Sequence, residues 1–597
     1  MIENNYSTVW DLDIFFKGGS SSSEFAAHLK ETLKKVSDFT NLVEEWLPSN
    51  TVKDHQKLTL FIEDLQIIAK RIRQEGAFIS CLQAQDTTDK KVAELRANHT
   101  EISAAFQTGL TIFDHKLRKI DQDVWELVLE HEPLKDISFI LSERRTRAFE
   151  KLSQEEESLI NALSIDGYHS WGQMYDLIVS SIKIKLKEDG EEKLLSVGQA
   201  ANYFSNSDRT IRQKVFKEWE RAWGEKIDYL TKTLNHLAGF RLNVYKSRGW
   251  NDVLKEPLNY NRMEKDTLET MWTVVSENKQ SLVNFLTRKA KLLGLEKLSW
   301  YDIEAPLNSQ KEKLSFQQGA EFILEHFSKF GSELTKFTKQ AFEDKWIEAE
   351  DRPGKAPGGF HTYFPESGQS RIFMTYSGTL SNVSTLAHEL GHGFHTYAMR
   401  DLHVLNRDYA MNVAETASTF AEMIVSDASV KSATNKEQKI ALLEDKVQRS
   451  VSFFMNIHAR FLFETRFYEE RQKGIVSTEK LNELMLAAQQ EAYCGALEEY
   501  HPLFWASKLH FYITRVPFYN FPYTFGYLFS LGIYAKALEE GKGFENQYIA
   551  LLKDTASMTV EELAMKHLNE DLTKRDFWER AVKLCVADIE EFLALTE

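Results

Sequence analysis

The chain has 597 residues, of which 43% are hydrophobic and 27% are charged; this composition is typical of a globular protein, and the length predicts more than one lobe. Its formal net charge of −16 argues against nucleic acid as the main partner, because phosphate binding needs a basic surface. Cys81, Cys494 and Cys585 are too few and too far apart to form a disulfide framework or a paired cysteine metal motif.

The first 25 residues contain no basic region followed by an apolar core, so we expect no secretory signal peptide. No apolar run reaches the length that a membrane-spanning helix needs. These features predict a cytoplasmic protein without a membrane partner. The sequence does not indicate an oligomeric state.

Amphipathic helices are predicted from residue 25 to about residue 190, and again over 209–250. The first of them places apolar residues at three- and four-residue spacing, at Phe25, Leu29, Leu33, Val36 and Phe39. Only 27 glycines and 10 prolines interrupt the whole chain, which favours long helices. We therefore predict a mainly α fold.

Two segments break this helical pattern. Residues 346–380 hold three of the ten prolines and predict a Gly/Pro loop followed by a short strand at 371–379, "RIFMTYSGT". Residues 501–530 hold three more prolines and are dense in tyrosine and phenylalanine. Irregular backbone within a helical protein often carries function, so both segments are candidates for a site.

The stretch "TLAHELGHGFHTYAM" (385–399) contains the pattern H-E-x-x-H. His388 and His392 are four residues apart, so on a helix both imidazoles face the same side and can bind one ion at about 2.0–2.1 Å. Glu389 lies about 100° further round the helix, where it can reach a water on that ion. Zinc lowers the pKa of such a water, and a carboxylate can then accept its proton.

The alternative is a helix that merely contains histidines, since a chance H-E-x-x-H is expected in roughly one chain in twenty-five of this composition. Gly391 and Gly393 favour the metal site. Each costs a helix about 1 kcal/mol relative to alanine, which a close-packed neighbour or a metal would explain.

A catalytic zinc is usually held by three protein ligands. Ala398 stands where a longer motif would have its third histidine, and His395 is about two turns from His388. The next helical segment, 407–427, contains Glu415, which we predict as the third ligand. Glu422, two turns later, either hydrogen-bonds a ligating histidine or is a solvated acid.

Hydrolysis of a peptide also needs a donor for the oxyanion, usually a tyrosine or a histidine. The aromatic segment offers five candidates: His510, Tyr512, Tyr519, Tyr523 and Tyr527. Any single one of them is more often a core residue than a donor, so the segment as a whole is the stronger prediction.

Together, "LAHELGHGFH", "AETASTFAE" and "LHFYITRVPFYNFPYTFGYLFS" resemble the oligoendopeptidase F branch of the M3 zinc oligopeptidases, relatives of thimet oligopeptidase and neurolysin. "WDLD" and "HLAGFRLNVYKSRGWNDVLKEPL" are also similar to that branch, so the resemblance covers most of the chain from about residue 10. It implies a mainly α, two-lobed body with a deep central channel and a small β element beside the H-E-x-x-H helix. We place the N-terminal helical lobe at 1–200 and the helical catalytic lobe at 201–597.

The same resemblance implies one Zn²⁺ per chain, with His388, His392 and Glu415 as ligands and Glu389 as general base. It further implies that His510, Tyr519, Tyr523 and Tyr527 bind substrate or stabilise the oxyanion. Tyr519 and Tyr523 match the oligoendopeptidase F pattern, whereas Tyr527 matches the thimet-like branch, so the choice of tyrosine stays open. The loop at 352–359 resembles a flexible loop near the substrate.

The first hypothesis is a zinc-dependent oligoendopeptidase that cuts inside short peptides. The second is a zinc carboxypeptidase or dipeptidyl carboxypeptidase, in which Arg515 would hold the terminal carboxylate of the substrate. The third is a peptide-binding protein with a dead site, which the presence of ligands and base disfavours. The sequence contains no G-x-S-x-G, P-loop or G-x-G-x-x-G motif that would indicate another chemistry.

Overall fold

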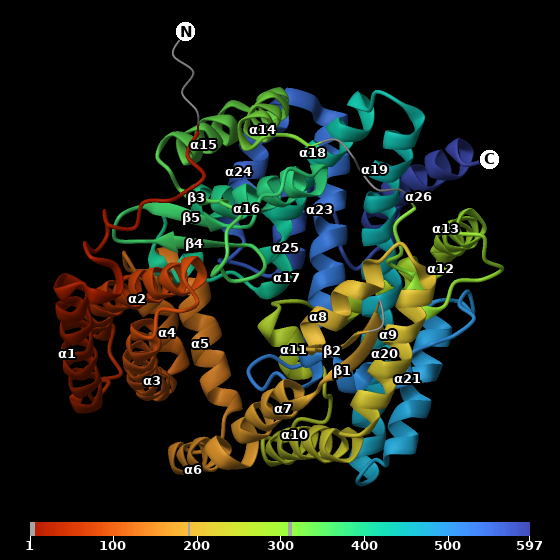
Figure 1. Cartoon of the computed structure of the whole chain (residues 1–597). Helices are drawn as coiled ribbons and strands as arrows, with labels where there is room; N and C mark the ends of the chain where they lie inside the picture. Colours follow the sequence, from red (N-terminus) through yellow and green to blue (C-terminus); the bar gives the residue numbers. More distant parts are fainter. Residues whose placement is uncertain (1–5, 189–190, 308–312) are drawn as a thin grey trace.

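The computed structural model of the chain describes residues 6–188, 191–307 and 313–597 (Figure 1). Within these residues the fold is mainly α, as predicted, with two small sheets. The N-terminal helices are α1 (Ser23–Glu45), α2 (Asp54–Gln85), α3 (Lys91–Arg118), α4 (Gln122–Leu129), α5 (Ser138–Glu150), α6 (Gln154–Ser164) and α7 (Ser170–Ser181).

The remaining helices form the larger part of the molecule. Those before the central sheet are α8 (Val197–Asn202), α9 (Arg209–Gly224), α10 (Ile227–Ser247), α11 (Lys255–Tyr260), α12 (Lys265–Glu277), α13 (Lys279–Leu292), α14 (Phe316–Phe330) and α15 (Ser332–Glu343). Those after it are α16 (Leu380–Ala398), α17 (Met411–Ala414), α18 (Thr416–Ser432), α19 (Lys436–Val451), α20 (Ile457–Lys473), α21 (Thr478–Ala492), α22 (Phe504–Ser507), α23 (Phe521–Glu540), α24 (Phe544–Asp554), α25 (Val560–Leu568) and α26 (Arg575–Leu595).

Helix α1 shows how the sequence pattern becomes structure. Ser22 caps its N-terminus by accepting a hydrogen bond from the backbone N–H of Phe25. Phe25, Val36 and Phe39 are buried as the spacing predicts, and α1 packs on α2 and α3 with this stripe. Leu33, which the same stripe included, is 40% exposed, because it lies at the edge of the buried face.

The buried side chains form two hydrophobic cores. The first extends from Trp10 to Leu141 and also takes in Phe364 and Phe373 from the central sheet. The second extends from Tyr168 to Phe592. The lobe boundary near residue 200 stays a prediction.

A two-stranded hairpin corrects the prediction of helices up to residue 190. Helix α7 ends at Ser181, and β1 (Ile184–Glu188) then pairs antiparallel with β2 (Glu191–Leu195). Ile182, Ile184 and Leu186 are buried at alternate positions against exposed lysines. This period of two is typical of a strand and distinguishes the segment from a helix.

The central sheet has the order β3 (Ile347–Glu348), β5 (Gln369–Phe373), β4 (Phe360–Phe364), with β3 parallel and β4 antiparallel to β5. The short strand predicted at 371–379 was placed too late, because the chain leaves the sheet after Phe373 to begin α16. The prediction also missed β4, which lies in the segment expected to be loop. Strand β4 contacts α2 on one side and α16 on the other, so the sheet joins the two lobes beside the H-E-x-x-H helix.

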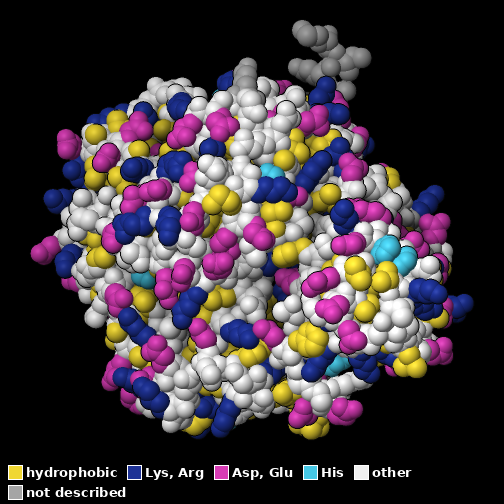
Figure 2. All heavy atoms as spheres, turned by 180° about the vertical axis from the view of Figure 1, so that it is seen from behind, with side chains coloured by type: hydrophobic (Ala, Val, Ile, Leu, Met, Phe, Trp, Pro, Cys, Tyr) yellow, Lys and Arg dark blue, Asp and Glu magenta, His cyan; other side chains and the backbone are white. Residues whose placement is uncertain are grey.

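Five helices, α16, α17, α18, α23 and α26, pack together in the larger part of the molecule. Helix α16 packs on α18, and α23 packs on α17, α18 and α26 (Figure 1). Among the described residues, no helix is long and apolar enough to cross a membrane. On the face drawn in Figure 2, acidic and basic side chains are interspersed rather than gathered into blocks of one sign.

Candidate metal centre

Helix α16 holds the two histidines of the H-E-x-x-H pattern in a fixed orientation. Its N-terminus is closed by a capping box, in which Thr379 Oγ1 accepts from the N–H of Asn382 and the Asn382 side chain accepts from the N–H of Thr379. His388 and His392 follow on one face, and their rings are perpendicular with centroids 4.9 Å apart. Both rings therefore face the same point beside the helix.

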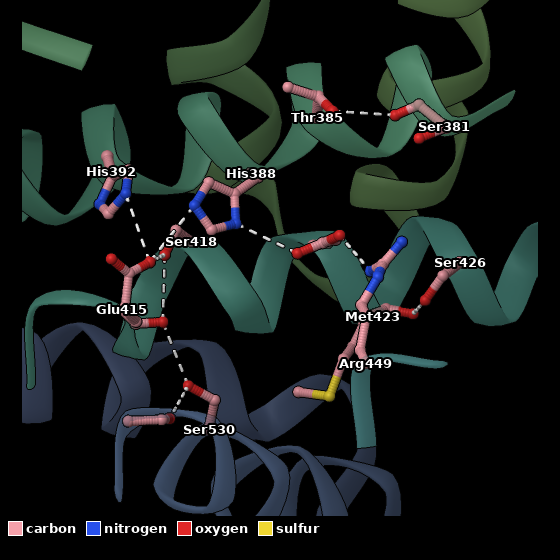
Figure 3. Close-up of polar contacts among 12 residues, drawn as sticks. Ser381, Thr385, His388, His392, Glu415, Ser418, Met423, Ser426, Arg449 and Ser530 are labelled. Carbon is pink, nitrogen blue, oxygen red and sulfur yellow. Dashed lines mark hydrogen bonds and ion pairs between the residues drawn. The ribbon is translucent and has the colours of Figure 1, made fainter. Parts of the chain in front are cut away.

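Glu415 reaches this point from the junction of α17 and α18, where it is the N-cap residue of α18 rather than a residue within one continuous helix. A Cβ at Gly391 would lie 2.6 Å from Ser418 Cα, so only glycine at 391 lets α16 and α18 approach this closely. Ser418 Oγ donates to Glu415 Oε2 over 2.8 Å, and Ser530 Oγ donates to the Glu415 carbonyl over 3.2 Å (Figure 3). Ser418 thereby orients the carboxylate, and Ser530 holds the backbone of the same residue.

The three side chains fit a single metal ion. Glu415 Oε2 lies 3.3 Å from His388 Nε2 and 3.5 Å from His392 Nε2, and the three ligand atoms are all within 4.8 Å of one another (Figure 3). Two imidazoles and one carboxylate form a donor set that catalytic zinc sites use, with a fourth position for water or substrate. His395 does not converge on this point, since its Nε2 lies 2.9 Å from Thr555 Oγ1.

The surroundings of the two histidines shift their pKa values in opposite directions. Burial disfavours the charged form of His388, but hydrogen bonds to Glu415 and Glu422 outweigh it and raise its pKa to about 10. Burial lowers the pKa of His392 to about 4. A bound cation takes the place of the proton that the carboxylates stabilise on His388, so metal binding should release a proton.

Glu422 lies behind the first histidine. Its Oε2 is 3.1 Å from His388 Nδ1, and its Oε1 is paired with Arg449, which also binds Asp445 Oδ2 over 2.6 Å. A carboxylate at the outer nitrogen of a ligating histidine fixes the orientation and tautomer of that ring. The structure thus favours the hydrogen-bonding role of Glu422 over that of a solvated acid.

Replacing Glu422 with alanine should weaken zinc binding by roughly 10- to 100-fold, because His388 loses the group that orients it. Glu422→Gln is the matched control, since its amide oxygen still accepts a hydrogen bond from Nδ1–H, and it should lose less affinity. The measurement is a competition titration against a chromogenic chelator. Equal zinc affinity in wild type and Glu422→Ala would show that this carboxylate does not orient the ligand.

Glu389 is buried, with 6% of its surface exposed, and its burial raises its pKa to about 7. Among the described residues, its Oε2 has no hydrogen-bond partner, which is unusual for a buried carboxylate. A Cβ at Gly359 would lie 3.2 Å from the other oxygen, Oε1, so the loop before β4 comes close to this side chain. An unpaired, buried carboxylate beside the metal ligands is placed to accept a proton from a water held there.

The aromatic segment gives its candidates different positions. His510, in the short 3-10 helix Leu509–Phe511, has ring centroid distances of 5.2 Å to Tyr519 and 5.9 Å to Tyr523. Tyr523 shares a cavity of about 440 Å³ with His388 and Glu415. Tyr527 lines the same cavity, but its hydroxyl lies 3.1 Å from Ser450 Oγ and 3.7 Å from Cys585 Sγ.

Tyr512, and Arg515 of the carboxypeptidase hypothesis, do not line this cavity. Tyr512 is 1% exposed and stacks on Tyr175 at 3.9 Å, which is a core position. Arg515 is exposed. The catalytic roles of His510 and of the three tyrosines stay predictions.

Sequence patterns missed three side chains that the fold brings to the centre. His361 on β4 has its ring centroid 6.5 Å from that of His392. In the sequence, only its position in a glycine-rich stretch could have indicated it. Ser418 could have been found from its position three residues after Glu415 at a helix start. Arg449 lies on α19, far along the chain from the metal motif, and no local pattern indicated it.

Comparison with known proteins agrees with this geometry. A family model described as Peptidase family M3 matches residues 202–584, and one described as Oligopeptidase F matches residues 116–184. The oligoendopeptidase F homolog of Lactococcus lactis subsp. lactis (strain IL1403) is 24% identical over 600 residues, which cover 98% of this chain and 97% of the relative. Oligopeptidase PepF of Bacillus subtilis (strain 168) is 23% identical over 599 residues, which cover 98% of this chain and 86% of the relative.

Solved structures share the fold. A peptidase of Chlamydophila abortus has a TM-score of 0.82 at 20% identity, with 98% of both chains covered. Oligoendopeptidase-F from Enterococcus faecium has a TM-score of 0.70 at 19% identity, covering 96% of this chain and 98% of that one. Because the M3 model matches more than half of the chain, the protein belongs to peptidase family M3 and is a metalloendopeptidase of its oligoendopeptidase F branch.

Proposed function

We propose that the protein is a zinc-dependent oligoendopeptidase that hydrolyses internal bonds of short, unstructured peptides. The observation that carries this proposal is the convergence of His388 Nε2, His392 Nε2 and Glu415 Oε2 within 4.8 Å, beside the buried carboxylate of Glu389. These three residues would hold the zinc ion. When bound, zinc acidifies water and polarises a carbonyl group.

The chain's own residues then move the proton. Glu389 accepts it from the attacking water on its unpaired Oε2, and later delivers it to the nitrogen of the leaving amine. The raised pKa of about 7 suits a group that must both accept and release a proton near neutral pH. Glu422 and Arg449 hold His388 in place while this happens.

Tyr523 is the tyrosine best placed to donate to the oxyanion. It shares the cavity with His388 and Glu415, and burial together with the neighbouring Tyr519 raises its pKa, so its hydroxyl keeps its proton. We expect Tyr523→Phe to lower kcat by roughly 10²–10³ with little change in KM, as the loss of an oxyanion donor does.

Tyr527→Phe is the matched control, because the Tyr527 hydroxyl already lies against Ser450 and Cys585. It should change kcat by less than about threefold. Loss of this hydrogen bond costs only about 1 kcal/mol of folding stability and does not touch the reacting groups. Steady-state kinetics on one quenched peptide compares the two. A large loss in Tyr527→Phe with none in Tyr523→Phe would reverse the assignment.

Peptides blocked at both ends test the endopeptidase proposal. We expect an N-acetylated, C-terminally amidated decapeptide to be cleaved at an internal bond, within about threefold of the rate for the unblocked peptide. The reason is that the proposed reaction does not use the charged ends of the substrate. Mass spectrometry of the products locates the bond. Cleavage that requires a free C-terminal carboxylate would instead support a carboxypeptidase. The central channel and the cytoplasmic location stay predictions.

A further inference from the structure

A buried glutamate on α20 holds the backbone of the aromatic segment just ahead of Tyr523. Glu464 is 6% exposed, and its Oε1 accepts a hydrogen bond from the backbone N–H of Phe518 over 3.3 Å. Its other oxygen, Oε2, accepts from the side-chain amide of Asn520 over 2.6 Å. A single carboxyl group therefore binds the residue before Tyr519 and the residue after it.

The backbone between these two contacts has an uncommon conformation. Phe518 has a φ of 51°, in the left-handed region that residues other than glycine rarely adopt. Asn520 follows at φ −143° and ψ −71° and is the N-cap of α23, where its side-chain oxygen accepts from the N–H of Phe521. Its carbonyl accepts from the N–H of Tyr523 over 3.1 Å. Such a conformation persists only where its surroundings hold it in place.

Helix α20 also holds the ring of Phe518. Tyr468 lies one turn after Glu464 on this helix and stacks on the Phe518 ring, with centroids 5.4 Å apart. Phe518 and Asn520 are each 1% exposed, so water cannot readily replace the hydrogen bonds that Glu464 provides. The position of this turn therefore depends on α20.

The hydrogen bonds around Asn520 have a fixed direction. Its oxygen caps α23, so its NH₂ group must face Glu464. The backbone N–H of Phe518 is a second donor that faces the same side chain. An ionised carboxyl group offers an acceptor oxygen to each donor, whereas a glutamine would bring its own NH₂ group against one of them.

We propose that Glu464 is a positioning residue for the reaction, which fixes Tyr519 and the start of α23 and so places the Tyr523 hydroxyl beside the metal centre. The proposal rests on the proposed function. The rings of Tyr519 and Tyr523 are 5.1 Å apart, so a shift of the turn would reach both. Glu464 does not line the cavity that Tyr523 shares with His388, so it acts through the turn rather than on the substrate.

Glu464→Gln should lower kcat by about 10- to 100-fold with little change in KM, because displacement of a reacting group by about 1 Å has an effect of this size. Zinc content should stay that of the wild type. Glu469→Gln is the matched control, since Glu469 is exposed on the same helix, and it should keep wild-type kinetics. Kinetics are followed at about pH 9, because burial raises the pKa of Glu464 to about 8 and both oxygens accept only above it.

Reversal of the hydrogen bond separates this role from a general loss of packing. Asn520→Asp alone should lower kcat, because it places two carboxyl groups against each other. In the double variant Glu464→Gln/Asn520→Asp, the glutamine amide donates to the new carboxylate, which still caps α23, while the glutamine oxygen accepts from Phe518. The double variant should recover kcat to within about tenfold of the wild type.

A double-mutant cycle with Tyr523→Phe tests whether Glu464 acts through the Tyr523 hydroxyl. Groups that act as one unit have effects that do not multiply. Adding Glu464→Gln to Tyr523→Phe should therefore lower kcat by less than about threefold beyond the loss in Tyr523→Phe alone. Thermal unfolding checks that each variant is folded, and the reversed pair provides the test if Glu464→Gln alone is unfolded.

The outcomes separate the two proposals. Wild-type kcat in Glu464→Gln, no recovery in the reversed pair, or losses that multiply with Tyr523→Phe would each overturn the positioning role and leave the oligoendopeptidase proposal standing. Absence of hydrolysis by the wild type would overturn the proposed function, and this role with it.

Discussion

Glu389→Gln should lower kcat/KM for peptide cleavage by a factor of roughly 10²–10⁴ while leaving zinc content unchanged. Glutamine keeps the shape of the side chain but cannot accept a proton from water. The zinc ligands His388, His392 and Glu415 are untouched, so the metal stays bound. Elemental analysis and cleavage of an internally quenched peptide of about ten residues measure the two effects on the same preparation.

An exposed glutamate controls for the substitution itself. Glu325 on α14 has 62% of its side chain exposed, and Glu325→Gln should retain wild-type activity. If Glu389→Gln held one zinc ion and cleaved the peptide as fast as wild type, Glu389 would not be the general base. Another carboxylate would then have to accept the proton of the attacking water.

Glu415→Ala should lose zinc affinity by more than the roughly 100-fold that removal of an outer-shell group produces, because a direct ligand is gone. The two remaining imidazoles carry no charge to balance a divalent ion. Activity should fall with zinc content and recover in part at high added zinc. A chelator competition titration measures the affinity, and peptide cleavage over a zinc series measures the recovery.

Ser418→Ala is the informative companion variant. It removes the 2.8 Å hydrogen bond to Glu415 Oε2 but keeps the ligand, so it should weaken zinc binding much less. Wild-type zinc affinity in Glu415→Ala would place the third ligand elsewhere. His361 would then be the first residue to examine, since its ring centroid is 6.5 Å from that of His392.

Local spacing was enough to predict the part of the site that lies on one helix. His388 and His392 are neighbours on α16 because four residues make about one turn, and this holds wherever the helix forms. Glu415 needed a second helix, and the prediction placed it within a continuous segment. The structure instead puts it at the break between α17 and α18, beside Gly391, which allows α16 and α18 to approach each other closely.

Contacts between distant segments could not be predicted in the same way. Arg449 reaches Glu422 because α19 packs beside α18, and His361 reaches α16 through the pairing of β4 with β5. Helix packing determines the first contact and strand register the second, and neither can be predicted from a short stretch of sequence. The hairpin at 184–195 did leave one, since its alternation of apolar and charged residues has the period of a strand.

The most direct test of the account is reconstitution of the metal-free enzyme. The protein is stripped with a chelator, and zinc is returned in steps while cleavage of the quenched peptide is followed. If His388, His392 and Glu415 form a single catalytic centre, activity should rise in proportion to added zinc and level off at one ion per chain. Full cleavage by the stripped protein, or activity that does not follow zinc, would contradict the assignment of peptide hydrolysis to this centre.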